Sequence, residues 1–415
     1  MRLAGARPWS VPTAIRTVGI LAAAAALLAG LAACGPVPDA AAPARPVGTF
    51  SAPASIASNC SRDVTAAVLG WIASVGDGST LRFAPNACYR IDGTLRIENR
   101  NRLLIDGNGS TFRAFTSGRE LGARAARTRS QFKFVNGSDL RVQNLIVRGA
   151  NPHAGTGESA YVADLEAQHA FEIGGTRGLV LDHVQAYDVY GDFVYVGAPS
   201  SHVTVQNSVF ARNGRQGWTV AGGEYVTFDH DVLTDTRRST IDMEPNSVAS
   251  AQRHVTFSNN IFGPGRLLFL SNHGAPAPTQ DVSILNNTLV GKEMSIHVWG
   301  DPGVRSGFRV IGNKSDTGTS QSGGGAYYFH GTSDVLISGN VQPVQPGRGI
   351  SGVGLEAATN VSIVGNSFPD AVATVFFYPF DPANPFPPSR SITDSGNRIG
   401  APLVATPSRV ITSAP

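Results

Sequence analysis

Two acidic residues, Asp242 and Glu244, stand on either side of Met243 in the segment STIDMEPN. Alternate side chains of a strand point to the same face, so both carboxylates would point the same way, with Cα atoms ~6.6 Å apart. Carboxyl groups ~6.5–9.5 Å apart suit an inverting glycosidase, in which one acid protonates the leaving oxygen while the other activates water. The pair therefore predicts cleavage of a glycosidic bond, against the alternative of two solvated acids on a strand.

Other polar residues recur at matching places in neighbouring segments. Asp192 is expected ~9–10 Å from Asp242, as a third catalytic acid or a substrate clamp, or as a residue that satisfies the turn after Gly191. His297 is a candidate general acid or base. The candidate substrate-binding residues are rings, which offer flat apolar faces, and arginines, which donate to hydroxyl oxygens: Tyr195, Arg215, Arg238, Arg266, Trp299, Tyr328 and His330.

A single alignment of strand-like segments places these residues. The segments are QFKFV, HAFEIG, DFVYVG, QGWTVA, STIDME, RLLFLS, MSIHVW and GAYYFH, and in register they form two apolar columns that include Trp218, Ile241 and Met243. A slip of one residue would bury the charges instead, so the apolar columns must point inward. The outward column then consists of Lys133, Glu172, Tyr195, Thr219, Asp242, Phe269, His297 and Tyr328.

A second repeated segment has the form apolar-x-apolar followed by Asn, Gly or His, as in VTVQN, VTFDH, VTFSN and VSILN. From Val203 to Val361 it recurs every 23 to 29 residues. A unit this short cannot bury its own apolar face, so the units must stack on one another. The Asn-type residue after each strand suits a left-handed corner and can bond to its neighbour one turn along.

This pattern resembles the right-handed parallel β-helix of the pectate lyase and polygalacturonase superfamily over residues 91–380. The resemblance implies an all-β solenoid, here of about ten rungs, whose open end is closed by a helix. Residues 62–75 have the apolar spacing of such a capping helix. The resemblance lies in the repeat, since the Asn-Thr-Asp and Gly-His-Gly signatures of the hydrolases are absent, so no catalytic residue is carried over from it.

The ends of the chain differ from the repeat. Residues 1–34 have a basic leader and a short apolar run that ends in Leu31-Ala32-Ala33-Cys34, which resembles the lipobox of bacterial lipoproteins and implies lipidation of Cys34. The alternative is an ordinary export signal cut elsewhere in the Ala-rich run. Four segments are expected: the signal over 1–34, an Ala/Pro-rich tether over 35–55, the β-helix domain over 56–380 and a covering tail over 381–415.

Two further cysteines, Cys60 and Cys88, predict a disulfide rather than a metal site in an exported chain. The chain has 33 basic and 30 acidic residues, and three of the basic residues are leader arginines, so the remainder is formally neutral. This balance argues against nucleic-acid binding, which needs a basic footprint. The expected partners are a polysaccharide and, through a lipid anchor only, a membrane; we expect a monomer at the cell surface.

Three functions fit these residues. Hydrolysis of a polysaccharide is favoured slightly over a lyase or epimerase, in which an arginine (Arg215, Arg238 or Arg266) would neutralise a uronate carboxylate beside the base. Hydrolysis requires no cofactor, whereas a lyase would be compatible with Ca²⁺ bound by Asp192, Asp242 and Glu244. The third function is a non-catalytic, glycan-binding adhesin that uses the same aromatic rings and acids.

Overall fold

The computed structural model describes residues 45–270, 277–293, 296–300, 303–319, 325–378, 387–400, 404–405 and 409–413. The predicted lipidation residue Cys34 and the whole predicted signal, 1–34, lie outside the described residues. Among the described residues, no helix is both long enough and apolar enough to span a membrane.

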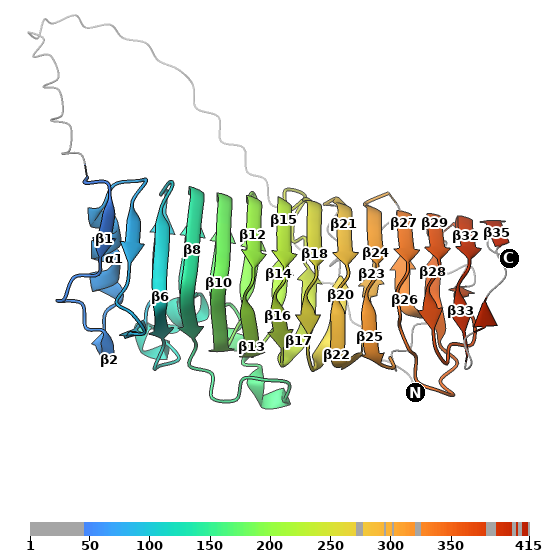
Figure 1. The fold of residues 1–415 in the computed structure, drawn as a ribbon, viewed down its shortest axis with the longest axis horizontal. Coiled ribbons are helices and arrows are strands. Elements are labelled where there is room, and N and C mark those ends of the chain that lie inside the picture. Colours follow the sequence, from blue (N-terminus) through green and yellow to red (C-terminus); the bar gives the residue numbers. More distant parts are fainter. Residues whose placement is uncertain are drawn as a thin grey trace, which may run out of the picture. The chain divides into compact units, whose positions relative to one another are not determined.

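The described chain winds into a coil of parallel strands, about twelve turns long rather than the ten predicted. Figure 1 shows the strands side by side in chain order, from β1 at one end to β32 near the other. The predicted all-β solenoid is thus confirmed. One side of the coil is an eleven-stranded sheet made of β5 (Leu95–Glu98), β7 (Phe132–Val135), β9 (Phe171–Gly174), β11 (Val194–Gly197), β14 (Trp218–Val220), β17 (Thr236–Met243), β20 (Gly265–Leu270), β23 (Ile296–Val298), β26 (Gly325–His330), β28 (Ser351–Glu356) and β31 (Val375–Phe377).

The other sides belong to a 21-stranded sheet that bends at a corner within each turn. Its strands are β1 (Thr49–Ser51), β2 (Asn59–Asp63), β3 (Thr80–Arg82), β4 (Cys88–Arg90), β6 (Leu104–Arg113), β8 (Ser138–Arg148), β10 (Arg177–Val189), β12 (Ser201–Gln206), β13 (Val209–Asn213), β15 (Gly223–Asp229), β16 (Val232–Thr234), β18 (Gln252–Ser258), β19 (Ile261–Phe262), β21 (Thr279–Leu285), β22 (Thr288–Glu293), β24 (Arg305–Ile311), β25 (Lys314–Thr317), β27 (Thr332–Ser338), β29 (Thr359–Val364), β32 (Arg390–Ser395) and β35 (Arg409–Ser413). A small third sheet contains β30 (Ser367–Phe368), β33 (Arg398–Ile399) and β34 (Val404–Ala405).

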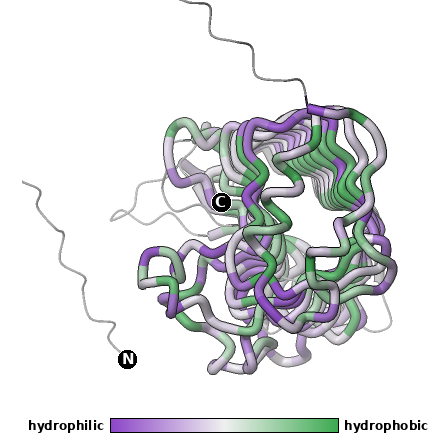
Figure 2. The backbone as a smooth tube through the Cα atoms, turned by 90° about the vertical axis from the view of Figure 1, so that its left-hand side faces the viewer, coloured by the Kyte–Doolittle hydropathy of each residue, from purple (hydrophilic) through white to green (hydrophobic). Residues whose placement is uncertain are grey.

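The predicted register is confirmed on both sheets. In the long sheet Val203 pairs with Val226, and Val226 pairs with Val255. In the eleven-stranded sheet Thr219 pairs with both Tyr195 and Asp242. Because successive turns superimpose (Figure 2), residues one turn apart lie directly above one another, and side-chain columns run along the coil.

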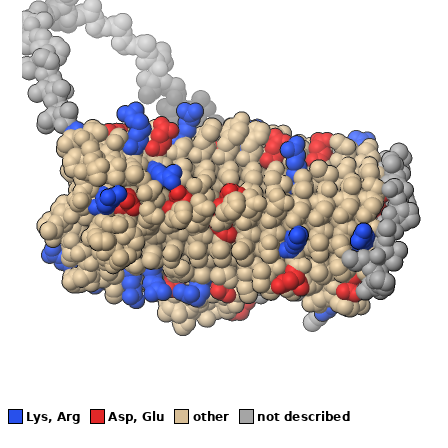
Figure 3. All heavy atoms as spheres, in the orientation of Figure 1, with Lys and Arg blue, Asp and Glu red and all other residues tan. Residues whose placement is uncertain are grey.

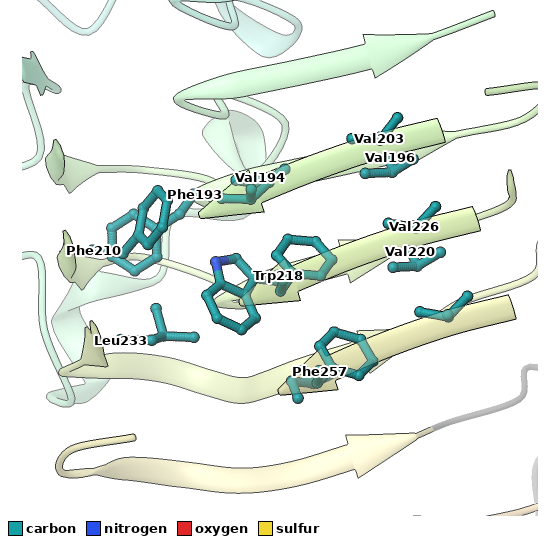
Figure 4. Close-up of a cluster of buried hydrophobic side chains, with 14 of the residues drawn as sticks. Phe193, Val194, Val196, Val203, Phe210, Trp218, Val220, Val226, Leu233 and Phe257 are labelled. Carbon is teal, nitrogen blue, oxygen red and sulfur yellow. The ribbon is translucent and has the colours of Figure 1, made fainter. Parts of the chain in front are cut away.

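The interior is filled by the apolar columns. Trp218 is fully buried, and its ring stacks on Phe228 at 4.5 Å between centroids, while Phe228 stacks on Phe257 at 5.2 Å. Figure 4 shows Trp218, Phe257 and Leu233 meeting inside the coil with Phe210 beside them. Burial of these rings fixes which face of each strand is outward, because the alternate residues must then leave the core.

The polar corner uses two adjacent positions, where one was expected. The first adopts a positive φ, as at Asn259 with 56°. The second is buried, and its side chain bonds one turn along: the Asn260 backbone N–H donates to Asn287 Oδ1 at 2.9 Å, and Asn287 donates likewise to Asn313 at 2.9 Å. The same ladder continues through Asn340, Asn366 and Asn397.

The N-terminal end is closed by α1 (Thr65–Ser74), which buries Val68, Trp71 and Ile72. This confirms the capping helix, although it begins later than predicted because residues 59–63 pair as β2 with β4. The predicted disulfide is present and joins Cys60 of β2 to Cys88 of β4. The other helical segments are α2 (Ala123–Arg127), η1 (Arg119–Leu121), η2 (Glu158–Ala160) and η3 (Ala163–Leu165).

The coil extends beyond the boundaries expected from sequence. Strand β1 falls within residues 35–55, the expected tether, and pairs with β3. Strand β32 falls within residues 381–415, the expected tail, and pairs in parallel with β29. Both segments contribute regular turns because their short apolar strands continue the columns, as Ile392 does beside Val361.

Candidate functional site

A cavity of about 300 Å³ opens on the outer face of the eleven-stranded sheet, over β7, β9 and β11. Three residues of the predicted outward column, Lys133, Glu172 and Tyr195, lie along its wall. Lys133 Nζ donates to Glu172 at 2.5 Å, and the Ser130 hydroxyl donates to the same carboxylate at 2.6 Å. The remaining lining residues are Thr128, Glu166, Ala167, His169, Arg215, Glu244 and Asn246.

Arg215 links most of the acids at this site. Its Nη1 lies 2.8 Å from Asp192 Oδ2, its Nη2 lies 3.2 Å from Glu244 Oε2, and its Nε lies 3.6 Å from Glu166 Oε2. Burial disfavours the charged guanidinium, but the attraction of Asp192 and Glu244 outweighs it and raises the pKa of Arg215. The predicted substrate-binding arginine therefore organises the carboxylates.

Asp192 is fully buried beneath this network and does not line the cavity. Its Oδ1 accepts from the Gln216 backbone N–H at 2.9 Å, and its Oδ2 accepts from the Thr219 hydroxyl at 2.8 Å in addition to Arg215. Burial raises the pKa of Asp192, although Arg215 and these hydrogen bonds oppose the rise. The structure thus gives Asp192 the contacts of a residue that positions Arg215.

Asp242 lies at its predicted place in the outward column, yet it is only 2% exposed. Its Oδ2 accepts from Gln216 Nε2 at 2.8 Å, whereas its Oδ1 has no hydrogen-bond partner among the described residues. Burial, followed by the charges of Glu244 and Asp192, raises the pKa of Asp242 to about 7. The carboxyl group therefore holds a proton up to near-neutral pH, while Glu244 is paired with Arg215.

The cavity also contains a stacked ring pair, His169 and Tyr195, with centroids 4.9 Å apart. Burial lowers the pKa of His169 to about 3, and its Nδ1 accepts from the Asp192 backbone N–H at 3.0 Å. Burial, together with the charge of Glu244, raises the pKa of Tyr195 to about 12. At neutral pH both rings are uncharged, and the pair forms an aromatic surface beside the acids.

A second cluster lies further along the same sheet. His297 and Tyr328 pair across β23 and β26, with ring centroids 5.7 Å apart. Tyr328 donates to Glu356, whose carboxylate also lies 3.2 Å from His330 Nδ1. Trp299 is 57% exposed beside His330, and burial lowers the pKa of His297.

Two turns separate this second cluster from Asp242, because β20 lies between β17 and β23. The candidates predicted as one site therefore form two groups on a shared sheet. Of the remaining candidates, Arg238 is exposed and lies over the Tyr161 ring at 4.0 Å. Arg266 pairs with Ser239 through its backbone, and its side chain lies outside what the structure describes.

Several residues of the site were not among the predicted site residues. Lys133 and Glu172 stood in the outward column, and His169 and Gln216 begin two of the aligned segments, but nothing in the alignment distinguished them from the other polar residues. Glu166 comes from the long segment between β8 and β9, where no strand register predicts its position. Glu356 lies one turn beyond the last aligned segment.

Among the described residues, no group of three or more His, Cys, Asp or Glu side chains is arranged to hold a metal ion. For a lyase, Ca²⁺ is expected to bind to Asp192, Asp242 and Glu244. Two of these carboxylates are instead bonded to an arginine, because Arg215 bonds both Asp192 and Glu244. The residues present do not fit the ion at that position.

No protein-family model and no curated protein sequence matches the chain. Solved structures resemble it over most of its length. The surface adhesin PfbA of Streptococcus pneumoniae has a TM-score of 0.61 at 12% identity, covering 88% of this chain and 98% of that one. The A-module of the Azotobacter vinelandii mannuronan C-5 epimerase AlgE6 has a TM-score of 0.59 at 12% identity, covering 85% and 93%.

The family 28 exopolygalacturonase of Yersinia enterocolitica has a TM-score of 0.57 at 11% identity, covering 87% of this chain and 80% of that one. At such low identities these likenesses concern the fold alone. They agree with the parallel pairing and the capped coil described above. The chain has the right-handed parallel β-helix fold of pectate lyase-like and polygalacturonase-like proteins.

Proposed function

We propose that this protein is a polysaccharide-cleaving enzyme, a glycoside hydrolase whose catalytic acid is Asp242 and whose catalytic base is Glu244. The observation that supports it is that Asp242 of β17, whose pKa burial raises to about 7, lies two residues before Glu244, whose carboxylate is bound by Arg215. A carboxyl group whose pKa is raised toward neutrality is what the role of general acid requires.

The proposed reaction uses the carboxyl groups of Asp242 and Glu244. The proton of Asp242 passes to the glycosidic oxygen as the bond to the anomeric carbon breaks. Glu244 accepts a proton from the water that attacks the opposite face of that carbon, so the configuration inverts. Arg215 acts as a positioning residue because it holds Glu244, and Asp192 does so because it holds Arg215.

The rest of the sheet provides the binding surface. Glu244 lines the cavity beside the His169–Tyr195 ring pair, whereas Asp242 is nearly covered. We therefore place the cleaved bond at the Asp242 edge of the cavity, with sugars on one side against Tyr195. On the other side the chain would pass toward His297, Trp299, Tyr328 and His330.

Lyase or epimerase chemistry receives less support. It needs a base near its working pH and a cation to neutralise the uronate carboxylate. Arg215 is already bonded to two carboxylates. Among the rings of the cavity, His169 with a pKa of about 3 and Tyr195 with a pKa of about 12 are both far from the range of an efficient base.

A second candidate function is glycan binding without turnover. Its specific support is the 2% exposure of Asp242 and the pairing of Lys133 with Glu172, which leaves the cavity charges mutually satisfied. The fold of the surface adhesin PfbA is compatible with this reading. Binding would use the aromatic surface in the same way but would not need a protonated carboxyl group.

The proposed function also requires that the protein be exported to the cell surface. We propose export by residues 1–34, anchoring through a lipid on Cys34, and an Ala/Pro-rich tether that carries a monomeric enzyme to extracellular polysaccharides. A Cys34→Ala variant should then move from the membrane fraction to the medium. Retention of that variant in the membrane fraction would contradict the anchor without affecting the catalytic proposal.

The catalytic test is a screen of plant, algal and bacterial cell-wall polysaccharides, assayed for new reducing ends and for ultraviolet-absorbing unsaturated products. Asp242→Asn and Glu244→Gln should each lower turnover by about 10²–10⁴-fold, the usual contribution of a general acid or base. Glu224→Gln, an exposed acid of β15, is the matched control.

Near-full activity in either variant would refute the pair. An unsaturated product would refute hydrolysis in favour of elimination. Retained glycan binding with no product from any ligand would establish the binding function instead.

A further inference from the structure

A second polar surface lies away from the eleven-stranded sheet, on the outer face of β4, β6 and β8. Arg90 pairs with Arg113, and Arg113 pairs with Arg148, so three arginines stand in register on consecutive strands. Strands in a sheet are ~4.8 Å apart, so these like charges repel one another. Figure 3 shows basic side chains in a row along the lower edge of the N-terminal half of the coil.

Carboxylates balance this column only in part. Arg90 is paired with Asp92 at 2.6 Å. Asp188 is shared by Arg148 at 3.2 Å and Arg212 at 2.8 Å, and Asp235 adds a longer-range attraction to Arg212.

Arg113 has no ion pair with any residue that the structure describes. Its guanidinium instead lies over the Phe115 ring at 4.6 Å from the centroid. Arg113 is exposed, so its N–H donors are open to solvent and to a bound anion.

The guanidinium groups are held in place by aromatic rings. Arg90 and Arg113 both lie over the Phe115 ring, and Arg148 and Arg212 both lie over the Tyr187 ring. A guanidinium attracted to a ring in this way keeps its N–H donors available for a carboxylate. Arg148 and Arg212 are each 42% exposed, so these donors can reach a bound molecule.

A cavity of about 420 Å³ lies over this column, lined by Arg113, Phe115, Arg148, Asp188 and Arg212, with Arg113 and Arg148 on adjacent strands of its floor. It shares no lining residue with the cavity beside Glu244. We infer that this surface, which we call the arginine column (Arg90, Arg113, Arg148 and Arg212), binds a carboxylate-bearing polysaccharide such as a polyuronate.

The observations favour a polyuronate over the other polyanions. The donors repeat from strand to strand, so they suit a chain with a carboxylate on each sugar rather than a single small anion, and the planar fork matches a carboxylate in two-point contact. Proteins that bind single-stranded nucleic acid offer open aromatic faces for base stacking. Here guanidinium groups lie over Phe115 and Tyr187, so less of each ring is open to a base.

The test measures binding of the full chain to an oligogalacturonate and to a neutral cello-oligosaccharide of equal length, by calorimetry at low and high salt. The oligogalacturonate should bind at least about tenfold more tightly, and salt should weaken it. The double variant Arg113→Gln/Arg148→Gln should lose about tenfold in affinity for the oligogalacturonate. The control Arg309→Gln removes an exposed arginine from β24 and should change nothing.

The variants should fold, because removing a charge from the column relieves repulsion; circular dichroism checks this. Arg113→Glu is the second variant, and it should weaken binding more than the glutamine variant does. Equal binding of the neutral oligosaccharide, or unchanged affinity in the double variant, would overturn the inference. So would tighter binding of a single-stranded oligonucleotide of equal charge. An Asp242→Asn protein that still binds through the column would separate this inference from the catalytic proposal.

Discussion

At the scale of single residues, Asp231 shows how one atom changes the chemistry of a repeat. It occupies the buried corner position at which later turns carry asparagine, and its Oδ1 accepts from the Ser208 N–H at 2.8 Å. The ladder asparagines also donate to a backbone carbonyl, as Asn260 Nδ2 does to Phe228 O at 3.1 Å. Asp231 lacks that donor when ionised, and its Oδ2 has no partner among the described residues. Burial raises its pKa to about 8.

Asp231→Asn should therefore stabilise the protein at alkaline pH. In the unfolded chain this carboxyl group ionises near pH ~3.9, so the wild-type protein loses stability from there up to about pH 8. The asparagine variant should show no such loss, and its advantage in free energy of unfolding should reach about 1–3 kcal/mol above pH 8. Urea unfolding at pH 5 and pH 9 measures the difference.

Asp229→Asn, two residues earlier, is a control for which the opposite change in stability is expected. Hydrogen bonds from Ser258 and Asn259 outweigh burial and lower the pKa of Asp229, so its ionised form stabilises the fold above the unfolded pKa. Its loss should cost stability at pH 9. An Asp231→Asn advantage that does not grow with pH would show that the carboxyl group is already ionised in the folded state.

At the scale of elements, the last turn of α1 depends on a side chain from the turn between β5 and β6. Arg100 donates through Nη1 to Ile72 O at 2.6 Å and through Nη2 to Val75 O at 2.8 Å, and its Nε lies 2.7 Å from Asp77. Carbonyls at a helix C-terminus have no partner within the helix. Arg100 thus fastens the capping helix to the first turns of the coil.

Replacing this residue tests that role. Arg100→Met keeps the apolar stem but leaves two buried carbonyls without their donor and Asp77 with Asn101 as its donor, so it should lower the free energy of unfolding by about 2–4 kcal/mol. Arg96→Met, which removes an exposed pair with Glu98, should lower it far less, because solvent screens exposed ion pairs. Thermal unfolding of both variants gives the comparison, and equal effects would refute the special role of Arg100.

The elements also show what the sequence could predict. The apolar columns predicted strand register and the outward positions of Tyr195, Asp242 and His297, because only one register buries the large side chains. They did not predict how deeply each outward side chain is buried. Asp192 and Asp242 lie on the outward face and are still buried, because Arg215 and Gln216 cover them. Nor could they position Glu166, which comes from a loop that no strand pairing constrains.

At the scale of the whole coil, each turn contacts mainly the turns on either side, so stability should vary along its length. The disulfide between Cys60 and Cys88 closes a 28-residue separation at the capped end, and loops of this size contribute about 2–4 kcal/mol. A Cys60→Ser/Cys88→Ser variant should therefore raise amide hydrogen exchange in β2, β4 and α1. Exchange in β21, β24 and β27 should stay unchanged, because many turns separate them from the cap. A uniform rise along the coil would show instead that the turns unfold as one cooperative unit.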